Sequence, residues 1–130
     1  MATVTFRDET AAGRPVTEWE VAGLPERMTV RELIGLRVRE EVARYNSHPG
    51  DRFNGLVRPD DAETEPNGHR LREPRRIDGE RQAGITERAF LANGFFVLVG
   101  DRQVEDLDEV VDLTGDPDLV FIKLVALVGG

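Results

Sequence analysis

The chain has no cysteine, two histidines, and only one serine and one lysine among its 130 residues. Without cysteine, a disulfide framework, a thiolate nucleophile and a zinc knuckle are excluded. Long apolar runs are also missing, and the N-terminal segment lacks the basic-then-apolar pattern of a signal peptide. These absences predict a cytoplasmic protein with no membrane partner.

The few reactive side chains do not form a catalytic pattern. Ser47 stands beside His48, but there is no nucleophile elbow and no base-orienting pair. His48 and His69 fall in expected loops without ligand-spaced partners, so each is expected to face solvent. The acid-rich residues 106–109 lack the glycine and spacing of a calcium loop, which favours solvated acids. The sequence predicts a protein that is not an enzyme and holds no cofactor or metal.

Charge is unevenly distributed along the chain. The formal net charge is -8, which argues against nucleic acid as a partner because phosphate binding needs a basic surface. Residues 101–118 hold eight acids and one base, a block of -7, and residues 69–88 hold six arginines and four acids, a block of +2. Two solvated faces account for this pattern. The alternative is that one block docks on a partner, either a second copy or an enzyme.

The first third of the chain predicts a hairpin. Residues 3–7 alternate with period two and place Val4 and Phe6 on one face of a strand. Residues 8–14 are expected to turn, and alternation resumes over residues 16–21. This pattern is typical of two strands with one buried and one wet face.

A helix is predicted to start at Thr29. The segment Thr29–Glu32 fits a capping box, in which the threonine hydroxyl and the glutamate carboxylate satisfy each other's backbone amides. The helix is expected to run to about Tyr45 and to stop before His48. Apolar residues recur at helical spacing and predict its buried stripe: Val30, Leu33, Ile34, Val38 and Val42.

Residues 46–77 have a weaker pattern. Residues 53–57 are predicted to pair with residues 69–71 as a small extra hairpin. The stretch between them, residues 59–68, is acidic and rich in proline and glycine, which is typical of a mobile loop.

A second helix is predicted after Asp78, its N-cap, with a stop at Asn93-Gly94. Its apolar stripe is expected to contain Ile85, Ala89 and Phe90.

The last third is expected to be strands and turns. Residues 95–99 form a continuous apolar run, as expected of a central strand that is covered on both faces. Residues 100–102 predict a tight turn, residues 107–113 a short helical turn and a bend, and residues 119–125 the final strand.

The order of these elements predicts the fold class. Hairpin, helix, insertion and strands follow one another without a repeat or a linker, as in an α+β domain with a helix packed across one face of a mixed sheet. We expect one domain over residues 1–130, with an insertion at 46–92 and a flexible tail at 126–130.

Residues 95–108, the strand at 119–125 and the closing Gly129-Gly130 resemble the C-terminal half of ubiquitin-like β-grasp proteins. The resemblance is strong over residues 75–130 and topological over residues 1–45, and the insertion is a departure from ubiquitin. The chain is similar to bacterial ubiquitin-like proteins that work with activating enzymes, conjugating enzymes and deubiquitinase-like metalloproteases. Antiviral defence is the setting that this resemblance implies. More distantly, the chain is similar to ubiquitin and to the sulfur carriers of molybdopterin and thiamine synthesis.

The resemblance implies that the C-terminal carboxylate of Gly130 reacts. An activating enzyme would adenylate it with the enzyme's own ATP, and thioesters would carry it to target amines in an isopeptide bond. Gly129 and Gly130 would thread a narrow channel because they lack Cβ, with apolar contacts from Leu127 and Val128. The single lysine, Lys123, leaves one side-chain amine for chain building on the protein itself.

A partner surface is expected on the last strands. Both faces of residues 119–125 are apolar, so we expect partial cover by the insertion, with some of Phe96, Leu98 and Phe121 left for a partner. A purely structural role in the core is the equal alternative for each. Two other functions stay open: a sulfur carrier that is thiocarboxylated at Gly130, and a self-assembling structural module that forms homo-oligomers.

Overall fold

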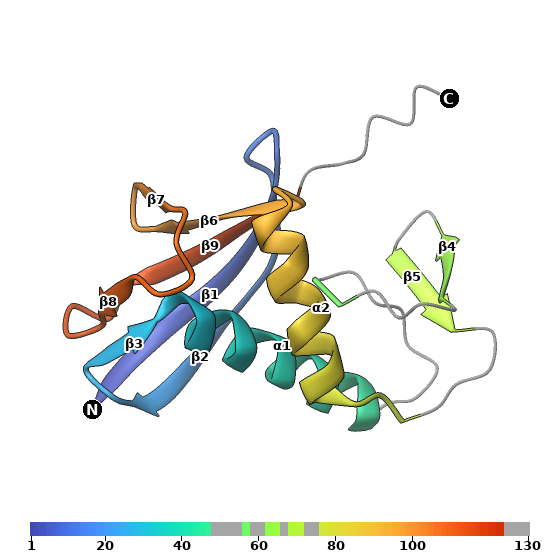
Figure 1. Cartoon of the computed structure of the whole chain (residues 1–130), viewed down its shortest axis with the longest axis horizontal. Coiled ribbons are helices and arrows are strands. Elements are labelled where there is room, and N and C mark those ends of the chain that lie inside the picture. Colours follow the sequence, from blue (N-terminus) through green and yellow to red (C-terminus); the bar gives the residue numbers. More distant parts are fainter. Residues whose placement is uncertain (48–55, 58–61, 66–67, 72–75, 124–130) are drawn as a thin grey trace. The chain divides into compact units, whose positions relative to one another are not determined.

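The computed structural model describes residues 1–47, 56–57, 62–65, 68–71 and 76–123 (Figure 1). Contacts between residues divide the chain into two compact units, residues 1–32 with 89–130 and residues 33–88. The elements in chain order are β1 (Ala2–Thr10), β2 (Pro15–Leu24), β3 (Arg27–Thr29), α1 (Val30–Ser47), β4 (Ala62–Glu65), β5 (Gly68–Leu71), α2 (Gly79–Leu91), β6 (Phe95–Val99), β7 (Arg102–Val104), β8 (Val110–Asp112) and β9 (Asp118–Lys123).

A five-stranded mixed sheet forms the first unit, in the order β2-β1-β9-β6-β7. Its central pair, β1 and β9, is parallel, from Thr5 opposite Asp118 to Thr10 opposite Lys123. The other neighbours are antiparallel. The α+β class and the mixed sheet are therefore confirmed. The prediction of one domain with an insertion at 46–92 stays a prediction.

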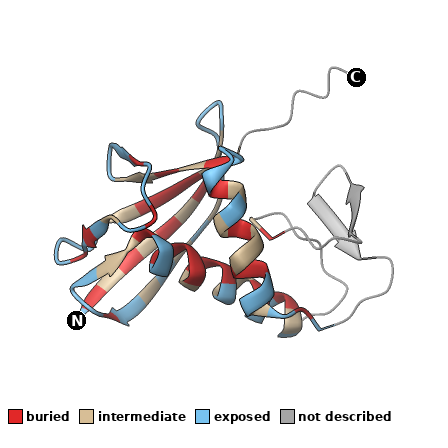
Figure 2. Cartoon of the chain, viewed as in Figure 1, coloured by how far each residue is buried: buried red, intermediate tan, exposed pale blue. Residues whose placement is uncertain are grey.

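The N-terminal hairpin is confirmed, and its first strand is longer than expected. Val4 and Phe6 are wholly buried on one face of β1, and Figure 2 shows buried and half-buried residues alternating along the strand. The sequence predicts Asp8 in the turn, yet Asp8 continues the alternation, is wholly buried and accepts a hydrogen bond from the Thr17 hydroxyl at 2.9 Å. The turn itself is residues 11–14, where Gly13 has a φ of 81°.

Five aromatic rings make a row through the core of the first unit. Phe6 lies 5.8 Å from both Trp19 on β2 and Phe121 on β9, between ring centroids. Phe95 on β6 lies 6.3 Å from Phe121 and 5.7 Å from Phe90 in the last turn of α2. Such tilted pairs each add about 0.5–1.5 kcal/mol beyond the burial of their area. The row joins four neighbouring strands through one continuous apolar contact.

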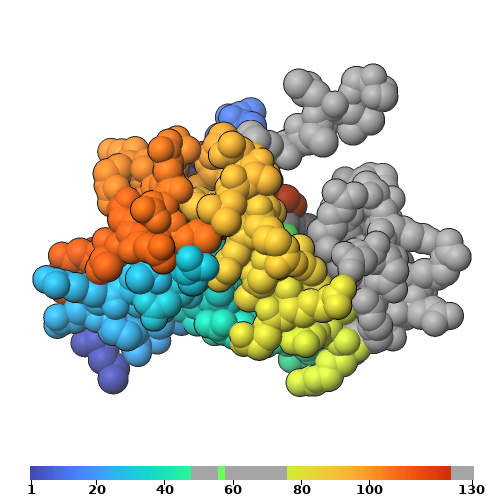
Figure 3. Space-filling view, viewed as in Figure 1, coloured from blue at the N-terminus to red at the C-terminus, as the bar shows by residue number. Residues whose placement is uncertain are grey.

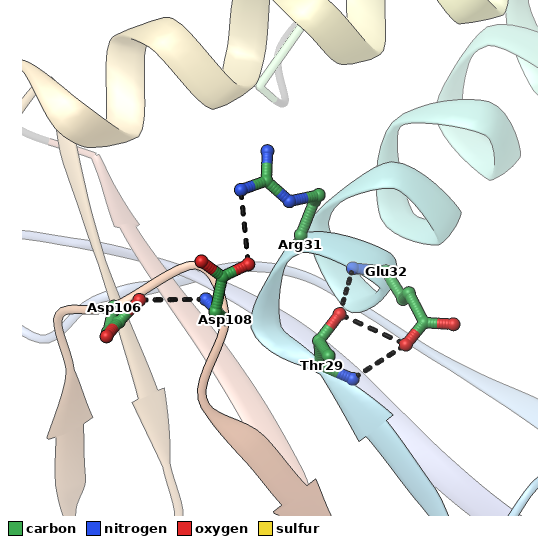
Figure 4. A network of polar contacts seen from close by, with 5 residues as sticks. All are labelled: Thr29, Arg31, Glu32, Asp106 and Asp108. Atoms are coloured by element: carbon green, nitrogen blue, oxygen red, sulfur yellow. Dashed lines mark hydrogen bonds and ion pairs between the residues drawn. The ribbon is translucent and has the colours of Figure 1, made fainter.

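The predicted capping box at the start of α1 is confirmed (Figure 4). The Thr29 amide donates to Glu32 Oε1 at 3.0 Å, and the Glu32 amide donates to the Thr29 hydroxyl at 3.1 Å. The hydrogen bond from the Thr29 amide, followed by the one from its hydroxyl, lowers the pKa of the Glu32 carboxyl. The helix extends to Ser47, and the predicted stripe from Val30 to Val42 is buried.

The rest of the α1 N-terminus is capped by residues distant in sequence. The Val30 amide donates to the Glu109 carbonyl and the Arg31 amide to the Leu107 carbonyl, both at 2.9 Å. Arg31 also pairs with Asp108 at 3.3 Å, and Asp106 accepts from the Asp108 amide (Figure 4). The amides of residues 29–32 have no acceptor in the helix backbone. Each of them is thus satisfied by a side chain or by a carbonyl outside the helix.

Strand β8 corrects the prediction for residues 107–113. A turn at 107–108 leads into β8, which pairs with β3 in place of the expected helical turn. The pairing aligns Met28 with Val111, and the Leu113 amide donates to the Glu26 carbonyl at 2.7 Å. The backbone groups of β8 form hydrogen bonds with residues that are distant in sequence. A local sequence pattern cannot predict such a pairing.

Both ends of α2 form as predicted. Asp78 Oδ1 accepts from the amides of Glu80 and Arg81, at 3.0 and 3.3 Å. At the other end, Asn93 has a φ of 60° and the Gly94 amide donates to the Ala89 carbonyl at 2.8 Å.

The predicted apolar stripe of α2 is only partly correct. Phe90 is buried as predicted, but Ile85 and Ala89 are only half-buried. The buried residues of the helix are Gln82, Ala83, Thr86 and Phe90. The side chains of Gln82 and Thr86 are polar.

The small hairpin of the second unit is shifted from its predicted place. β5 contains residues 69–71 as expected, and it pairs with β4. Residues 53–55 lie outside the described residues, and Val57 is buried outside any strand. β4 also lies within residues 59–68, for which the sequence predicts a loop. Only two residues separate β4 from β5, so closing this hairpin costs less entropy than the predicted pairing.

A buried ion pair holds α1 to residues 56–57 within the second unit. Arg37 donates to Glu41 Oε1 at 2.5 Å, and the two side chains are 1% and 14% exposed. The Glu41 oxygens also accept from the amides of Leu56 at 2.9 Å and Val57 at 3.0 Å. The sequence pattern missed this cluster, because charged residues four apart on a helix are usually a solvent-exposed pair.

We predict that Thr29→Ala destabilises the protein by about 1 kcal/mol through loss of the N-cap. The folded pKa of Glu32 is lowered below its unfolded value of about 4.3. The ionised Glu32 carboxylate therefore stabilises the fold fully above about pH 4.3, and this stabilisation is lost as the pH falls through the lowered pKa. Glu32→Gln should therefore flatten the acid side of the stability curve. Urea unfolding between pH 7 and pH 3 measures this, with Glu40→Gln in the same helix as the matched control. Equal acid sensitivity of Glu32→Gln and the unchanged protein would contradict the prediction.

We also predict that Glu41→Leu costs about 3–5 kcal/mol, because it leaves the buried Arg37 guanidinium without its carboxylate. Arg37→Met combined with Glu41→Leu should cost clearly less, since no uncompensated charge stays buried. Urea unfolding compares the variants, and hydrogen exchange at the Leu56 and Val57 amides reports the local contact. A double variant as unstable as Glu41→Leu would show that the uncompensated charge on Arg37 is not the cause of the lost stability.

Candidate functional site

The predicted conjugation residues lie at the end of the chain. Gly129, Gly130, Leu127 and Val128 are outside the described residues. The structure does describe the strand that leads toward them, up to Lys123 at the end of β9. Lys123 is half-buried and stands opposite Thr10 of β1 on one side and Phe95 of β6 on the other. The strand before the tail is thus an inner strand of the sheet.

An apolar patch occupies the sheet face opposite the aromatic row. Phe96 and Leu98 of β6 are half-buried, and they stand in register with Ile122 and Val120 of β9. Because side chains alternate along strands, these four residues share one face. We call Phe96, Leu98, Val120 and Ile122 the apolar patch, in which Val120 is buried and the other three are half-buried. It brings together two of the three predicted partner residues.

The structure places Phe121, the third predicted partner residue, in the core. It is wholly buried between Phe6 and Phe95. The period of a strand puts it on the opposite face from its neighbours Val120 and Ile122. Ile122 takes its place on the partly exposed face. The alternation in β9 separates the odd and even positions into two faces, but only the structure shows that the face with Phe121 is the core.

Strand β6 is less covered than predicted. Phe95 and Val97 are buried beside the aromatic row, whereas Phe96 and Leu98 on the other face are only half-buried. The continuous apolar run predicts a strand covered on both faces, and the structure corrects this. Half-cover of the second face leaves apolar area that another molecule can bury.

An ion-pair ladder borders the apolar patch on the β1 side. Arg7 of β1, in register with Val120, pairs with Glu18 of β2 at 3.1 Å and with Asp118 of β9 at 3.5 Å. The hydrogen bond to Glu18 is the main reason that the pKa of Arg7 is raised. The same sheet face therefore has a charged half and an apolar half.

Several side chains of the acidic block 101–118 form hydrogen bonds and ion pairs within the fold. Asp112 accepts from the Thr114 hydroxyl at 2.6 Å and from its amide at 2.9 Å, and these bonds lower the pKa of Asp112. Glu109 pairs with Arg102 at 2.7 Å, which raises the pKa of Arg102. Local hydrogen bonds thus hold several of these acids in place, in addition to the solvent exposure that the sequence predicts.

The second unit contains an open cleft of about 710 Å³ at the start of α2 and the last turns of α1. Several of its polar groups are engaged with one another. Asn46 donates to the Ile77 carbonyl at 3.1 Å and accepts from the Ile77 amide at 2.8 Å, and Arg39 pairs with Glu80 at 3.5 Å. These pairings join α1 to the segment before α2 and to the first turn of α2, and they engage part of the polar lining of the cleft.

The reactive residues singled out in the sequence are not assembled in the described structure. The Ser47 hydroxyl donates to the Ala43 carbonyl at 3.0 Å, and His48 is outside the described residues. His69 belongs to β5 and not to a loop. Within residues 1–47, 56–57 and 76–123, no histidine, aspartate and glutamate side chains group in threes to hold a metal. The helices that the structure describes are too short or too polar to cross a membrane.

We predict that the two faces of the sheet differ sharply when phenylalanine is truncated. Phe121→Ala should cost about 3–5 kcal/mol, because it opens a cavity in the core. Phe96→Ala, the matched change on the other face, should cost about 1 kcal/mol, because only part of that ring is buried. Urea unfolding followed by circular dichroism measures both. Similar losses for the two variants would contradict the assignment of Phe96 to a partly exposed face.

Known proteins were compared with this chain at three levels. No protein-family model matches it, and neither the curated proteins nor the solved structures include a significant match.

Proposed function

We propose that this chain is a ubiquitin-like protein modifier, activated at the carboxylate of Gly130 and transferred to target amines. The observation that carries the proposal is the parallel pairing of β1 with β9 in the middle of a mixed sheet. That strand order is compatible with a β-grasp, and we propose the β-grasp, with a helix across one face of the sheet, as the fold. In this proposal the protein is a cytoplasmic substrate of enzymes and not itself a catalyst.

The position of β9 supports this role for the tail. β9 is bonded on both sides, to β1 through residues 118–123 and to β6 through residues 119–123. A strand held on both sides gives the following segment a firm base, while residues without Cβ at the end fit a narrow channel most readily. The proposal requires a free carboxylate on Gly130 and an apolar, uncharged segment before it, and residues 124–130 are apolar and uncharged.

The chemistry follows from a free glycine carboxylate. An oxygen of the Gly130 carboxylate attacks the α-phosphorus of ATP on the activating enzyme, and pyrophosphate leaves. A cysteine thiolate of that enzyme then displaces AMP and forms a thioester. The thioester passes to a conjugating enzyme, and an amine of the target finally displaces the thiolate to form an amide. A metalloprotease that cleaves this amide would reverse the modification.

The apolar patch supports partner binding in the same proposal. Enzymes that handle the tail need a second contact on the folded part of the protein, because a short tail offers little area. Val120 and Ile122 lie on β9, the strand that precedes the tail in sequence, and Phe96 and Leu98 lie on the neighbouring strand β6. The partial exposure of Phe96, Leu98 and Ile122 and the adjoining Arg7 ladder fit a transient, protein-binding surface.

We predict that the tail leaves a diagnostic remnant on targets. The only lysine is Lys123 and no arginine follows it, so trypsin should leave residues 124–130 attached to the acceptor lysine. Mass spectrometry of digests from source cells that express the tagged full chain should find this remnant. Gly129→Val should reduce it at least about tenfold, because a small misplacement of a reacting group can cost a hundredfold in rate.

Gly115→Val is the matched control for that substitution. At Gly115, no atom beyond its two chain neighbours lies within 4 Å of the position that a Cβ would occupy, so a side chain fits there. It should leave the remnant at its normal level. A chain whose mass reports one oxygen replaced by sulfur, with no remnant on any lysine, would instead identify a sulfur carrier. Normal cellular function after deletion of Gly130 would favour the assembly module.

A further inference from the structure

A small cavity lies where the last turn of α2 meets β6 and β7 in the first unit. Its volume is about 240 Å³, and it is lined by Phe90, Leu91, Asn93, Phe95, Gln103 and Glu105 among others. We call it the β7 notch. In Figure 3 the C-terminal end of α2, in gold, adjoins the orange residues that follow β6. The volume is well above the roughly 30 Å³ of one water in the liquid, so the notch has room for the head of a long side chain.

The notch has an aromatic floor and a polar rim. Phe90 and Phe95 are buried, with 6% and 4% of their surface exposed, and form its inner wall. Asn93, Gln103 and Glu105 are exposed at its edge. In the described part of the chain, no hydrogen bond or ion pair engages these three side chains. One carboxylate and two amide oxygens are therefore available as acceptors for a donor that enters the notch.

The electrostatic environment of the notch favours a cation. The first unit holds 6 basic and 14 acidic residues, which gives 6 - 14 = -8, whereas residues 33–88 hold 11 of each and are neutral. All of the net charge thus belongs to the unit that contains the notch. The carboxyl end of α2, at Leu91, also carries the negative end of the helix dipole.

We propose that the β7 notch binds a basic side chain, arginine or lysine, on the surface of a partner protein. The exposed Leu91 side chain is placed to cover the aliphatic stem of such a residue. Glu105 accepts from the charged head, with Asn93 and Gln103 beside it. An acidic side chain is disfavoured by the charge of the whole unit. This site goes beyond the proposed function, because it needs neither the tail nor its activation.

The position of the notch connects it to the end of β9. Phe95, which forms part of its floor, stands opposite Lys123 in the sheet register. A partner that enters the notch is therefore anchored beside the last described residue before the tail. The notch also borders β7, the outer strand of the five-stranded sheet, which leaves its rim accessible.

Titration of the isotope-labelled full chain by NMR tests the proposal, with acetyl-Gly-Arg-Gly-amide as the probe. We expect saturable shifts at the backbone amides of Asn93, Gln103 and Glu105. The same peptide with citrulline in place of arginine should produce no saturable shift, because it keeps the shape and loses the charge. Glu105→Gln should weaken binding at least about fivefold, the effect of losing a hydrogen bond to a charged group.

Glu20→Gln is the matched control, since it removes the same charge from β2 at the opposite edge of the sheet. It should change the dissociation constant less than about twofold, because exposed distant charges are screened. Equal weakening by the two variants would show diffuse attraction to the acidic unit and overturn the proposal. An equal response to the citrulline peptide, or no saturable shift at these amides, would overturn it as well. The remaining amide peaks of each variant report whether its fold is intact.

Discussion

The parallel pairing of β1 with β9 is the constraint on which the rest of the first unit depends. It joins residues near the start of the chain to residues near its end, and everything between them must be a connection that returns the chain to the same sheet. β2 then lies outside β1, and β6 and β7 lie outside β9. The pairing also aligns Phe6 and Phe121 on one face, so the aromatic row through the core follows from it. An error of one residue in this register would exchange the core face and the partly exposed face.

The amides at the start of α1 are satisfied partly by neighbouring residues and partly by a segment distant in sequence. Thr29 and Glu32 satisfy each other's amides without help from the rest of the chain. The two amides between them depend on carbonyls at Leu107 and Glu109. An acid-rich segment whose composition indicates only solvated acids therefore completes a helix cap, and Arg31 fixes it through Asp108. Backbone geometry gives this segment its role, and its charge adds to that role through the helix dipole.

Strand β9 serves stability and the proposed function on its two faces. Leu119 and Phe121 belong to the core, and Val120 and Ile122 belong to the apolar patch beside the Arg7 ladder. The tail proposed to be activated continues from the same strand. A modifier built in this way would present its reactive end, its apolar patch and the β7 notch from adjoining strands. The concentration of all the net charge in this unit, with none in residues 33–88, fits a unit that meets partners.

Short-range signals determined much of this protein from the sequence alone: the hairpin, both helix starts, the glycine stop of α2 and the α+β class. Each depends on residues within a few positions of one another, where period and capping chemistry are sufficient. The tertiary structure alone decided the burial of Asp8 and Arg37, the pairing of β3 with β8, the place of β4, and the choice between Phe121 and Ile122 for the partly exposed face. These depend on register and on contacts between distant segments, because a side chain's surroundings are set by whichever strand or loop the fold brings beside it. The predicted tail chemistry depends on sequence alone, since residues 124–130 lie outside the described structure.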